Sequence, residues 1–321
     1  MIRTVFLGSP AAAVPSLQAL HGQEPVRLAG VVTQPDKPAG RRRRLQPCPV
    51  KQAAEALGLA VLTPRRIRDP EALQALRAWG PELAIVCAYG QLLPEALLEL
   101  PRLGCYNLHF SLLPRWRGAS PVQAALLAGD ATTGVSLQRM VLELDAGDVV
   151  AETPPLPIHP HDTAQSLGER LAVEAAALLA RSLPLLLGGN PPRRPQDSAA
   201  VTHCRLIRKE HGAVDFAVED AAQIERKCRA YTPWPGCFVF LGARRLGLAR
   251  VVPAAAPADP AGAADDAAPP GTLRADGCVR TRTGWLRLEE VRPEGKGTMP
   301  FAAFRNGNPA AIGARLTPAP A

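Results

Sequence analysis

The sequence predicts an α/β protein of two domains, in which a Rossmann-like, mostly parallel sheet with helices on both faces precedes a smaller C-terminal β-barrel. Short apolar runs alternate with helical patterns from the first residue to about residue 190, the segment "GGNPPRRPQ" then interrupts them, and strand-like runs at turn spacing follow. At 321 residues the chain is also long for a single hydrophobic core.

The first domain is expected over residues 1–188. Its strand-like runs are apolar on both faces, which is typical of parallel strands covered by helices. They include "RTVFLG", "VRLAGVVTQ", "ELAIVCAYG" and "CYNLHF", and the helical patterns include "AVPSLQAL", "PVKQAAEALG", "DPEALQALRAWG", "SPVQAALLAG" and residues 162–187. Ligands of such sheets bind beyond the carboxyl ends of the strands, where "CAYG" and "NLHF" end.

The second half of the chain has a different pattern of apolar and turn-forming residues. Residues 189–208 are expected to be a linker because Gly and Pro break the preceding helical pattern. Short apolar runs separated by turn residues predict a β-barrel over 209–321. Within it, residues 253–270 are low in complexity, and we expect a disordered loop there.

Composition narrows the classes of partner. The net charge of +8 favours a polyanion such as nucleic acid, although many basic proteins bind none. Seven scattered cysteines without a Cys-x-x-Cys pair indicate reduced thiols and a cytoplasmic protein. We expect no metal, because the nearest approaches to ligand spacing, His203 beside Cys204 and His159 with His161, have no second group of ligands to complete a site. We expect no nucleotide, because neither a P-loop nor G-x-G-x-x-G occurs. No apolar run is long enough to span a membrane.

The stretch "CYNLHFSLLPRWRG" carries the strongest chemical signal. In an extended segment Asn107 and His109 point to the same side, while Leu108 points into the core. An amide can donate to a developing oxyanion and an imidazole can move a proton, so the pair suits acyl transfer to an amine. The alternative is that the two side chains merely cap a strand. A carboxylate should hold the imidazole, and on spacing alone either Asp145 or Asp148 could do so.

Residues 35–51 form a loop, punctuated by Pro and Gly, that contains Arg41, Arg42, Arg43 and Arg44. Guanidinium groups pair with phosphates through two hydrogen bonds, so this loop could grip a nucleic-acid backbone. The alternative is an ordinary solvated charged face.

In order along the chain, "FLGSP", "TQPDKPAGRRRRLQPCPVK", "AYGQLLP", "PRLGCYNLHFSLLPRWRGASPVQ", "AGDATTGVSLQRM", "LDAGDVV", "LIRKEHGAVDF" and "CRAYTPWPGCFVF" resemble the methionyl-tRNA formyltransferases. The Asn-x-His with Ser-Leu-Leu-Pro is shared by enzymes that use 10-formyltetrahydrofolate in general. The arginine loop and "YTPWPG" narrow the resemblance to the tRNA enzymes.

The resemblance implies a catalytic domain, a linker and a tRNA-binding domain similar to an oligonucleotide-binding barrel. It implies catalytic roles for Asn107, His109 and Asp145, the last chosen by its place in Leu-Asp-x-Gly-Asp. It also implies folate contacts by Ser111, Leu112, Leu113 and Pro114, and tRNA contacts by the arginine loop.

The implied activity is transfer of the formyl group of 10-formyltetrahydrofolate to the α-amine of methionine on initiator tRNA, in translation initiation, by a protein expected to be a cytoplasmic monomer. The alternatives are a formyltransferase or hydrolase acting on a small molecule, and a non-catalytic RNA-binding relative. The sequence departs from the family at Phe110, where Gly is common, at Ala12, where an aromatic is common, and in the apolar lead-in to Asp145. None of these departures removes a catalytic group.

Overall fold

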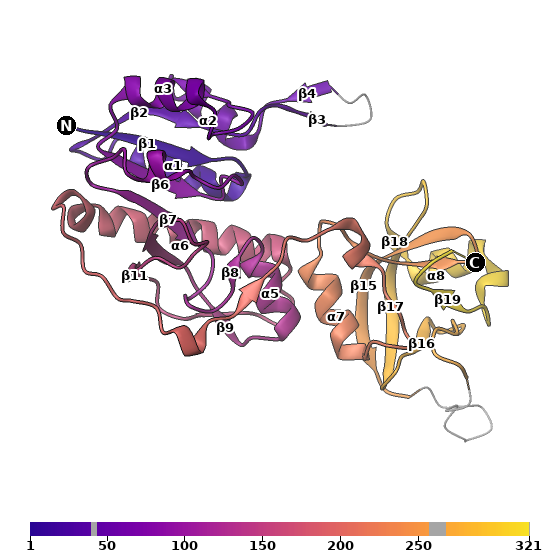
Figure 1. Cartoon of the computed structure of the whole chain (residues 1–321). Coiled ribbons are helices and arrows are strands. Elements are labelled where there is room, and N and C mark those ends of the chain that lie inside the picture. The colour runs from indigo at the N-terminus through magenta and orange to yellow at the C-terminus, as the bar shows by residue number, and fades with distance from the viewer. Residues whose placement is uncertain (40–43, 257–267, 321) are drawn as a thin grey trace. The chain divides into compact units, whose positions relative to one another are not determined.

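The computed structural model describes residues 1–39, 44–256 and 268–320, and the chain divides into two compact units (Figure 1). The first unit comprises residues 1–122, 131–158 and 166–206, and the second comprises 123–130, 159–165 and 207–321. Arg41, Arg42, Arg43 and most of the expected loop at 253–270 lie outside the described residues.

The first unit is built on a seven-stranded sheet in the order β11-β10-β7-β6-β1-β2-β5. The five strands from β7 to β5 are parallel, and β10 and β11 continue the sheet in antiparallel fashion. The strands are β1 (Ile2–Gly8), β2 (Val26–Val32), β5 (Val61–Leu62), β6 (Leu83–Cys87), β7 (Cys105–His109), β10 (Ser136–Arg139) and β11 (Val149–Glu152). The prediction of a mostly parallel sheet in the first domain is therefore confirmed.

Apolar side chains on both faces hold this sheet between helices. On one face Val5 and Leu7 of β1 pack with Leu76 of α3 and Leu97 of α4 in one buried cluster. The intervening Phe6 is also fully buried, as expected for a strand covered on both sides. The helices are α1 (Val14–Leu20), α2 (Pro49–Ala56), α3 (Pro70–Trp79), α4 (Glu95–Leu98), α5 (Pro121–Ala128) and α6 (Ala164–Leu187).

Local sequence signals explain where these helices begin and end. In α3, Pro70 occupies the first turn, where its missing N–H costs nothing, and Asp69 precedes it as the N-cap residue. Gly80 ends the helix in the left-handed conformation at φ 56°, which glycine adopts without steric cost. The predicted helix at residues 69–80 is therefore confirmed.

Three short strand pairs accompany the sheet, one of them the antiparallel pair of β9 (Thr132–Thr133) and β12 (Leu156–Pro157). β3 (Lys37–Ala39) and β4 (Arg44–Gln46) form an antiparallel pair after β2. β8 (Arg117–Gly118) pairs in parallel with β13 (His203–Cys204), which lies in the segment expected to be a linker. The loop after β7 and the segment around residue 203 are thus hydrogen-bonded to each other.

The second unit contains an antiparallel sheet in the order β16-β17-β15-β14-β19, with β18 also paired to β17. The path is open at β16 and β19, so the predicted β-barrel domain is an antiparallel half-barrel. Its elements are α7 (Ala221–Ala230), β14 (Cys237–Leu241), β15 (Arg244–Ala254), β16 (Cys278–Arg280), β17 (Trp285–Pro293), β18 (Met299–Pro300), α8 (Phe301–Gly307) and β19 (Leu316–Thr317). Among the described residues, no helix is both long and apolar enough to cross a bilayer.

Candidate active site

The candidate site lies at the carboxyl end of β7, next to its antiparallel neighbour β10. Asn107 pairs with Gln138 and His109 pairs with Ser136 across the two strands. Leu108 between them is 2% exposed, in agreement with its expected place in the core. Strand alternation therefore gives Asn107, His109 and their two partners a shared neighbourhood at the edge where the parallel strands end.

Asp145 contacts the other two residues predicted to be catalytic. Its Oδ1 accepts from Gln138 Nε2 at 2.8 Å and, more weakly, from Asn107 Nδ2 at 3.4 Å. Its Oδ2 accepts from the backbone N–H of Gly118 at 2.9 Å and lies 3.6 Å from Nδ1 of His109. The three side chains expected to be catalytic are thus neighbours, and the carboxylate that faces the imidazole is Asp145.

The His109 ring is almost completely buried, with 5% of the residue exposed. Its Nε2 lies 2.9 Å from the carbonyl oxygen of Trp116, which can only accept a hydrogen bond, so this nitrogen carries a proton. Its Nδ1 faces the Asp145 carboxylate. Each ring nitrogen therefore faces an oxygen atom of the protein.

The segment Ser111–Pro114 begins two residues after His109 and is held by hydrogen bonds. Ser111 is 1% exposed and donates through its hydroxyl to the Arg115 carbonyl at 2.6 Å. Leu113 donates through its backbone N–H to the Ser136 hydroxyl at 2.9 Å and is itself buried. Leu112 and Pro114 are half-buried. Ser136 therefore links β10 to the segment expected to contact folate.

The arginine loop is only partly described. Arg44 is exposed at the start of β4. The other three arginines expected to contact tRNA lie outside the described residues, so their part in the site stays a prediction.

Three residues that hydrogen-bond to Asp145 were not predicted from the sequence. Gln138 is 1% exposed and could have been found, because it alternates with Ser136 on a strand beside the Asn-x-His strand. Gly118 acts through its backbone N–H, which leaves no side-chain signal. Gln196 donates from its side chain to the carbonyl oxygens of Asp145 and Gly147, although it lies in the segment expected to be a linker.

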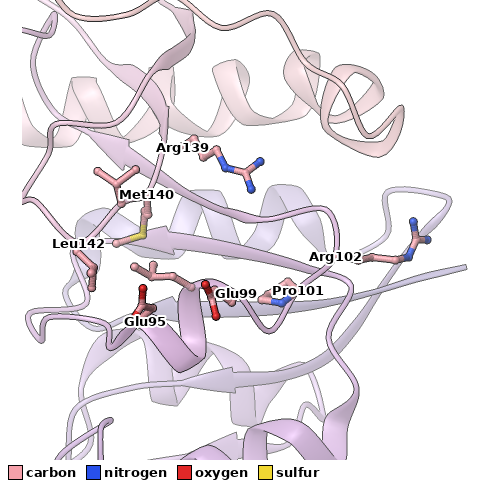
Figure 2. A pocket seen from close by; sticks show the side chains of 9 residues that line it. Glu95, Glu99, Pro101, Arg102, Arg139, Met140 and Leu142 are labelled. Atoms are coloured by element: carbon pink, nitrogen blue, oxygen red, sulfur yellow. The ribbon is translucent and has the colours of Figure 1, made fainter.

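A pocket of about 490 Å³ borders the loop that leads to Asp145 (Figure 2). One wall consists of α4 and the turn after it, and the other is the start of the loop after β10. The lining residues are Glu95, Leu98, Glu99, Pro101, Arg102, Arg139, Met140, Val141 and Leu142. Beyond Met140 the loop exposes apolar side chains, since Val141, Leu142 and Leu144 are 45%, 63% and 52% exposed.

Burial perturbs two thiols close to the site strands. It raises the pKa of Cys87, at the end of β6, to about 12, and the pKa of Cys105, at the start of β7, to about 12. Both therefore remain neutral thiols at physiological pH and are core residues. In the described ranges, no group of three or more His, Cys, Asp or Glu is placed to hold a metal ion.

Comparisons with known proteins identify the family of the chain. The family model described as "Formyl transferase" matches residues 2–183, and "Formyl transferase, C-terminal domain" matches residues 206–309. The methionyl-tRNA formyltransferase of Acidiphilium cryptum is 42% identical and that of Gluconobacter oxydans is 40% identical; each alignment covers 98% of this chain and 100% of the relative.

Among solved structures, the N-formyltransferase from Helicobacter canadensis in complex with folinic acid and dTDP-3-aminofucose has a TM-score of 0.60 and 14% identity. The match covers 89% of this chain and 98% of that chain, and it shows a shared fold. The two family models cover most of both units, and both of these full-length relatives are methionyl-tRNA formyltransferases. The chain therefore belongs to the methionyl-tRNA formyltransferases, within the formyl transferase family.

Proposed function

We propose that this chain transfers the formyl group of 10-formyltetrahydrofolate to the α-amine of methionine on initiator methionyl-tRNA. The observation that carries the proposal is the meeting of Asn107, His109 and Asp145 at the end of β7, in a chain about 40% identical to methionyl-tRNA formyltransferases over 98% of its length. Formyl transfer needs oxyanion donors and a route for protons, and it needs no nucleophilic side chain.

The amine nitrogen attacks the formyl carbon, and a tetrahedral intermediate with a negatively charged oxygen forms. Collapse breaks the bond to the folate nitrogen, which takes up a proton, while the attacking amine loses one. Asn107 is the direct oxyanion donor in this proposal. Its contact with Asp145 at 3.4 Å is long, and the amide has a second N–H for the substrate.

His109 is the second donor and the proton carrier. Both of its ring nitrogens already face protein acceptors, so it reaches the formyl oxygen by exchanging the Trp116 carbonyl for substrate. Hydrogen bonds of this kind commonly rearrange when a substrate binds. Asp145 orients the ring, because its Oδ2 faces Nδ1 of His109 at 3.6 Å.

The donor side of the site is assigned to Ser111, Leu112, Leu113 and Pro114, with tetrahydrofolate as the carrier of the formyl group. Supporting this, the loop that leads to Asp145 exposes Val141, Leu142 and Leu144, and a largely aromatic donor would cover such apolar side chains. The donor is a substrate here, and the proposal invokes neither a metal nor a nucleotide.

The acceptor side is assigned to the arginine loop with Arg41, Arg42, Arg43 and Arg44, and to the half-barrel of the second unit. Support comes from the net charge of +8 and from the match of the family's C-terminal domain to residues 206–309. We retain residues 1–188 as the catalytic domain, 189–208 as the linker and 209–321 as the tRNA-binding domain. We also propose a monomer, and a cytoplasmic location that is consistent with seven free cysteines.

The test is transfer of labelled formyl from 10-formyltetrahydrofolate to methionyl initiator tRNA, with uncharged tRNA and free methionine as controls. The wild type should label only the charged tRNA, and His109→Ala should lose nearly all turnover. Transfer to a small amine in preference to the charged tRNA would favour a small-molecule formyltransferase. Binding of tRNA without transfer would favour a non-catalytic RNA-binding protein.

A further inference from the structure

We propose that Gln196 is a positioning residue for Asp145, and that it holds the backbone of the loop on which the carboxylate is carried. The inference rests on the catalytic role proposed for Asp145. Gln196 lies between the two segments that the family models match, in a stretch whose composition predicts only a linker.

The side chain of Gln196 makes three hydrogen bonds. Its Nε2 donates to the carbonyl oxygen of Asp145 at 2.8 Å and to that of Gly147 at 2.7 Å. Its Oε1 accepts from Nε of Arg117 at 2.9 Å. A primary amide has two N–H groups and one carbonyl, so all of its hydrogen-bonding groups are engaged, and Gln196 spans Ala146 like a staple.

The loop around Asp145 needs support from Gln196 because few contacts within the loop hold its backbone. Asp145 adopts a left-handed backbone conformation with φ 52°, which is unfavourable for most residues other than glycine. At Gly147 a Cβ atom would lie 1.7 Å from the carbonyl oxygen of Arg139, so the turn is as tight as backbone allows. The preceding residues from Val141 to Leu144 are exposed and provide little packing.

Gln196 is itself held on both sides along the chain. On one side Arg194 and Val149 exchange two backbone hydrogen bonds of 2.9 Å, and the Arg194 side chain pairs with Glu152. On the other side Thr202 accepts from the backbone N–H of Trp116 at its hydroxyl and from that of Arg117 at its carbonyl, both at 2.9 Å. The staple is therefore anchored to β11 and to the loop before β8.

Residues 196–204 support Asp145 in two ways. Gln196 fixes the Asp145 backbone, while Thr202 and β13 fix the strand whose Gly118 donates to Oδ2 of Asp145. A shift of about 1 Å in a catalytic group can lower turnover about a hundredfold without touching substrate binding. Loss of the staple should therefore lower kcat and leave KM for both substrates nearly unchanged.

The test uses the full-length protein with Gln196→Glu and Gln196→Met. The first keeps shape and the Arg117 contact but removes the two donors, and the second removes polarity without adding charge. Asp145→Asn, alone and combined with Gln196→Glu, completes a double-mutant cycle. Gln18→Glu, at an exposed position of α1, is the matched control for added charge. Melting temperature, kcat and both KM values are measured for each variant.

We expect both Gln196 variants to lose at least about tenfold in kcat while Gln18→Glu loses none. In the Asp145→Asn background, Gln196→Glu should cost less than about twofold, because its effect passes through the carboxylate. Wild-type kcat in both Gln196 variants, or a full multiplicative loss in the double variant, overturns the inference even if Asp145→Asn has lost most of its activity. Full activity of Asp145→Asn overturns the proposed role of Asp145 together with the inference.

Discussion

The backbone N–H of Gly118 donates to Oδ2 of Asp145 at 2.9 Å, so a residue without a side chain supplies one of the hydrogen bonds of the site carboxylate. Any residue except proline has this N–H, so the hydrogen bond alone does not require glycine. The backbone does, because φ is 120° and a Cβ atom would lie 2.2 Å from the carbonyl oxygen of Cys204.

Gly118→Ala should therefore lower both activity and stability. The added methyl group pushes β8 away from β13 and draws the Gly118 N–H away from Asp145, so we expect at least a tenfold loss of kcat, on the order of what misplaced catalytic groups cost. Gly58→Ala is the control, because φ is 68° there but a Cβ atom meets nothing within 4 Å.

Gly58→Ala should cost about 1 kcal/mol in the free energy of unfolding and leave kcat unchanged. Gly118→Ala should cost a further 1–3 kcal/mol, roughly, because of the clash. Urea denaturation and formyl-transfer kinetics on both variants make the comparison. Equal kcat values for the two variants would show that the placement of Gly118 is unimportant for the carboxylate.

Asn107→Ala should lower turnover by about a hundred- to a thousandfold, the usual cost of one oxyanion donor. The side chain is half-buried in the middle of β7, so little change in fold stability is expected. Single-turnover formyl transfer to methionyl initiator tRNA measures the chemical step directly. Asn306→Ala, exposed in α8 of the second unit, is the control, and an Asn107→Ala enzyme with wild-type turnover would remove Asn107 from the mechanism.

The buried thiol of Cys87 should make stability fall in alkaline solution. Burial raises its pKa from 9.0 to about 12, so between these values the unfolded chain loses the proton and the folded chain keeps it. The contribution is fully present below pH 9 and is lost at roughly 1.4 kcal/mol per pH unit above it.

Urea denaturation of the wild type and Cys87→Ala, in reductant at pH 8 and pH 10, tests this contribution. At pH 8 the variant should be less stable because it has lost buried volume, and by pH 10 the difference should narrow by about 1.4 kcal/mol. The pKa of Cys105 is raised similarly, but this thiol is present in both proteins, so its contribution cancels in the comparison. A pH-independent difference between the two proteins would contradict the prediction.

Replacing Arg41, Arg42, Arg43 and Arg44 with alanine should lower kcat/KM for methionyl-tRNA and flatten its dependence on salt. Each lost phosphate contact reduces the slope of log kcat/KM against log salt by about 0.7–0.9. The KM for 10-formyltetrahydrofolate should not change. Arg27→Ala, exposed at the opposite end of β2, is the control, and an unchanged salt slope in the fourfold variant would rule out phosphate contacts by this loop.

The parts of this protein that could be predicted from sequence are those that depend on neighbouring residues. Alternation along β7 places Asn107 beside His109, and a Pro at the start and a Gly at the end bound α3. The contacts of Gln196 could not be predicted in this way. It bonds to backbone atoms about fifty positions away, and carbonyl acceptors leave no trace in the identity of their residues. Its Gly- and Pro-rich surroundings instead indicate a linker.

The hydrogen bonds of residues 194–204 determine where this chain can be exchanged with that of a relative. A chimaera joined at residue 189 would take Gln196 and Thr202 from one parent and the Asp145 loop from the other, and so would separate the two sides of the staple. A junction after Leu206, where the first unit ends, keeps them together. The residues after Leu206 can then be exchanged while the site carboxylate keeps its native support.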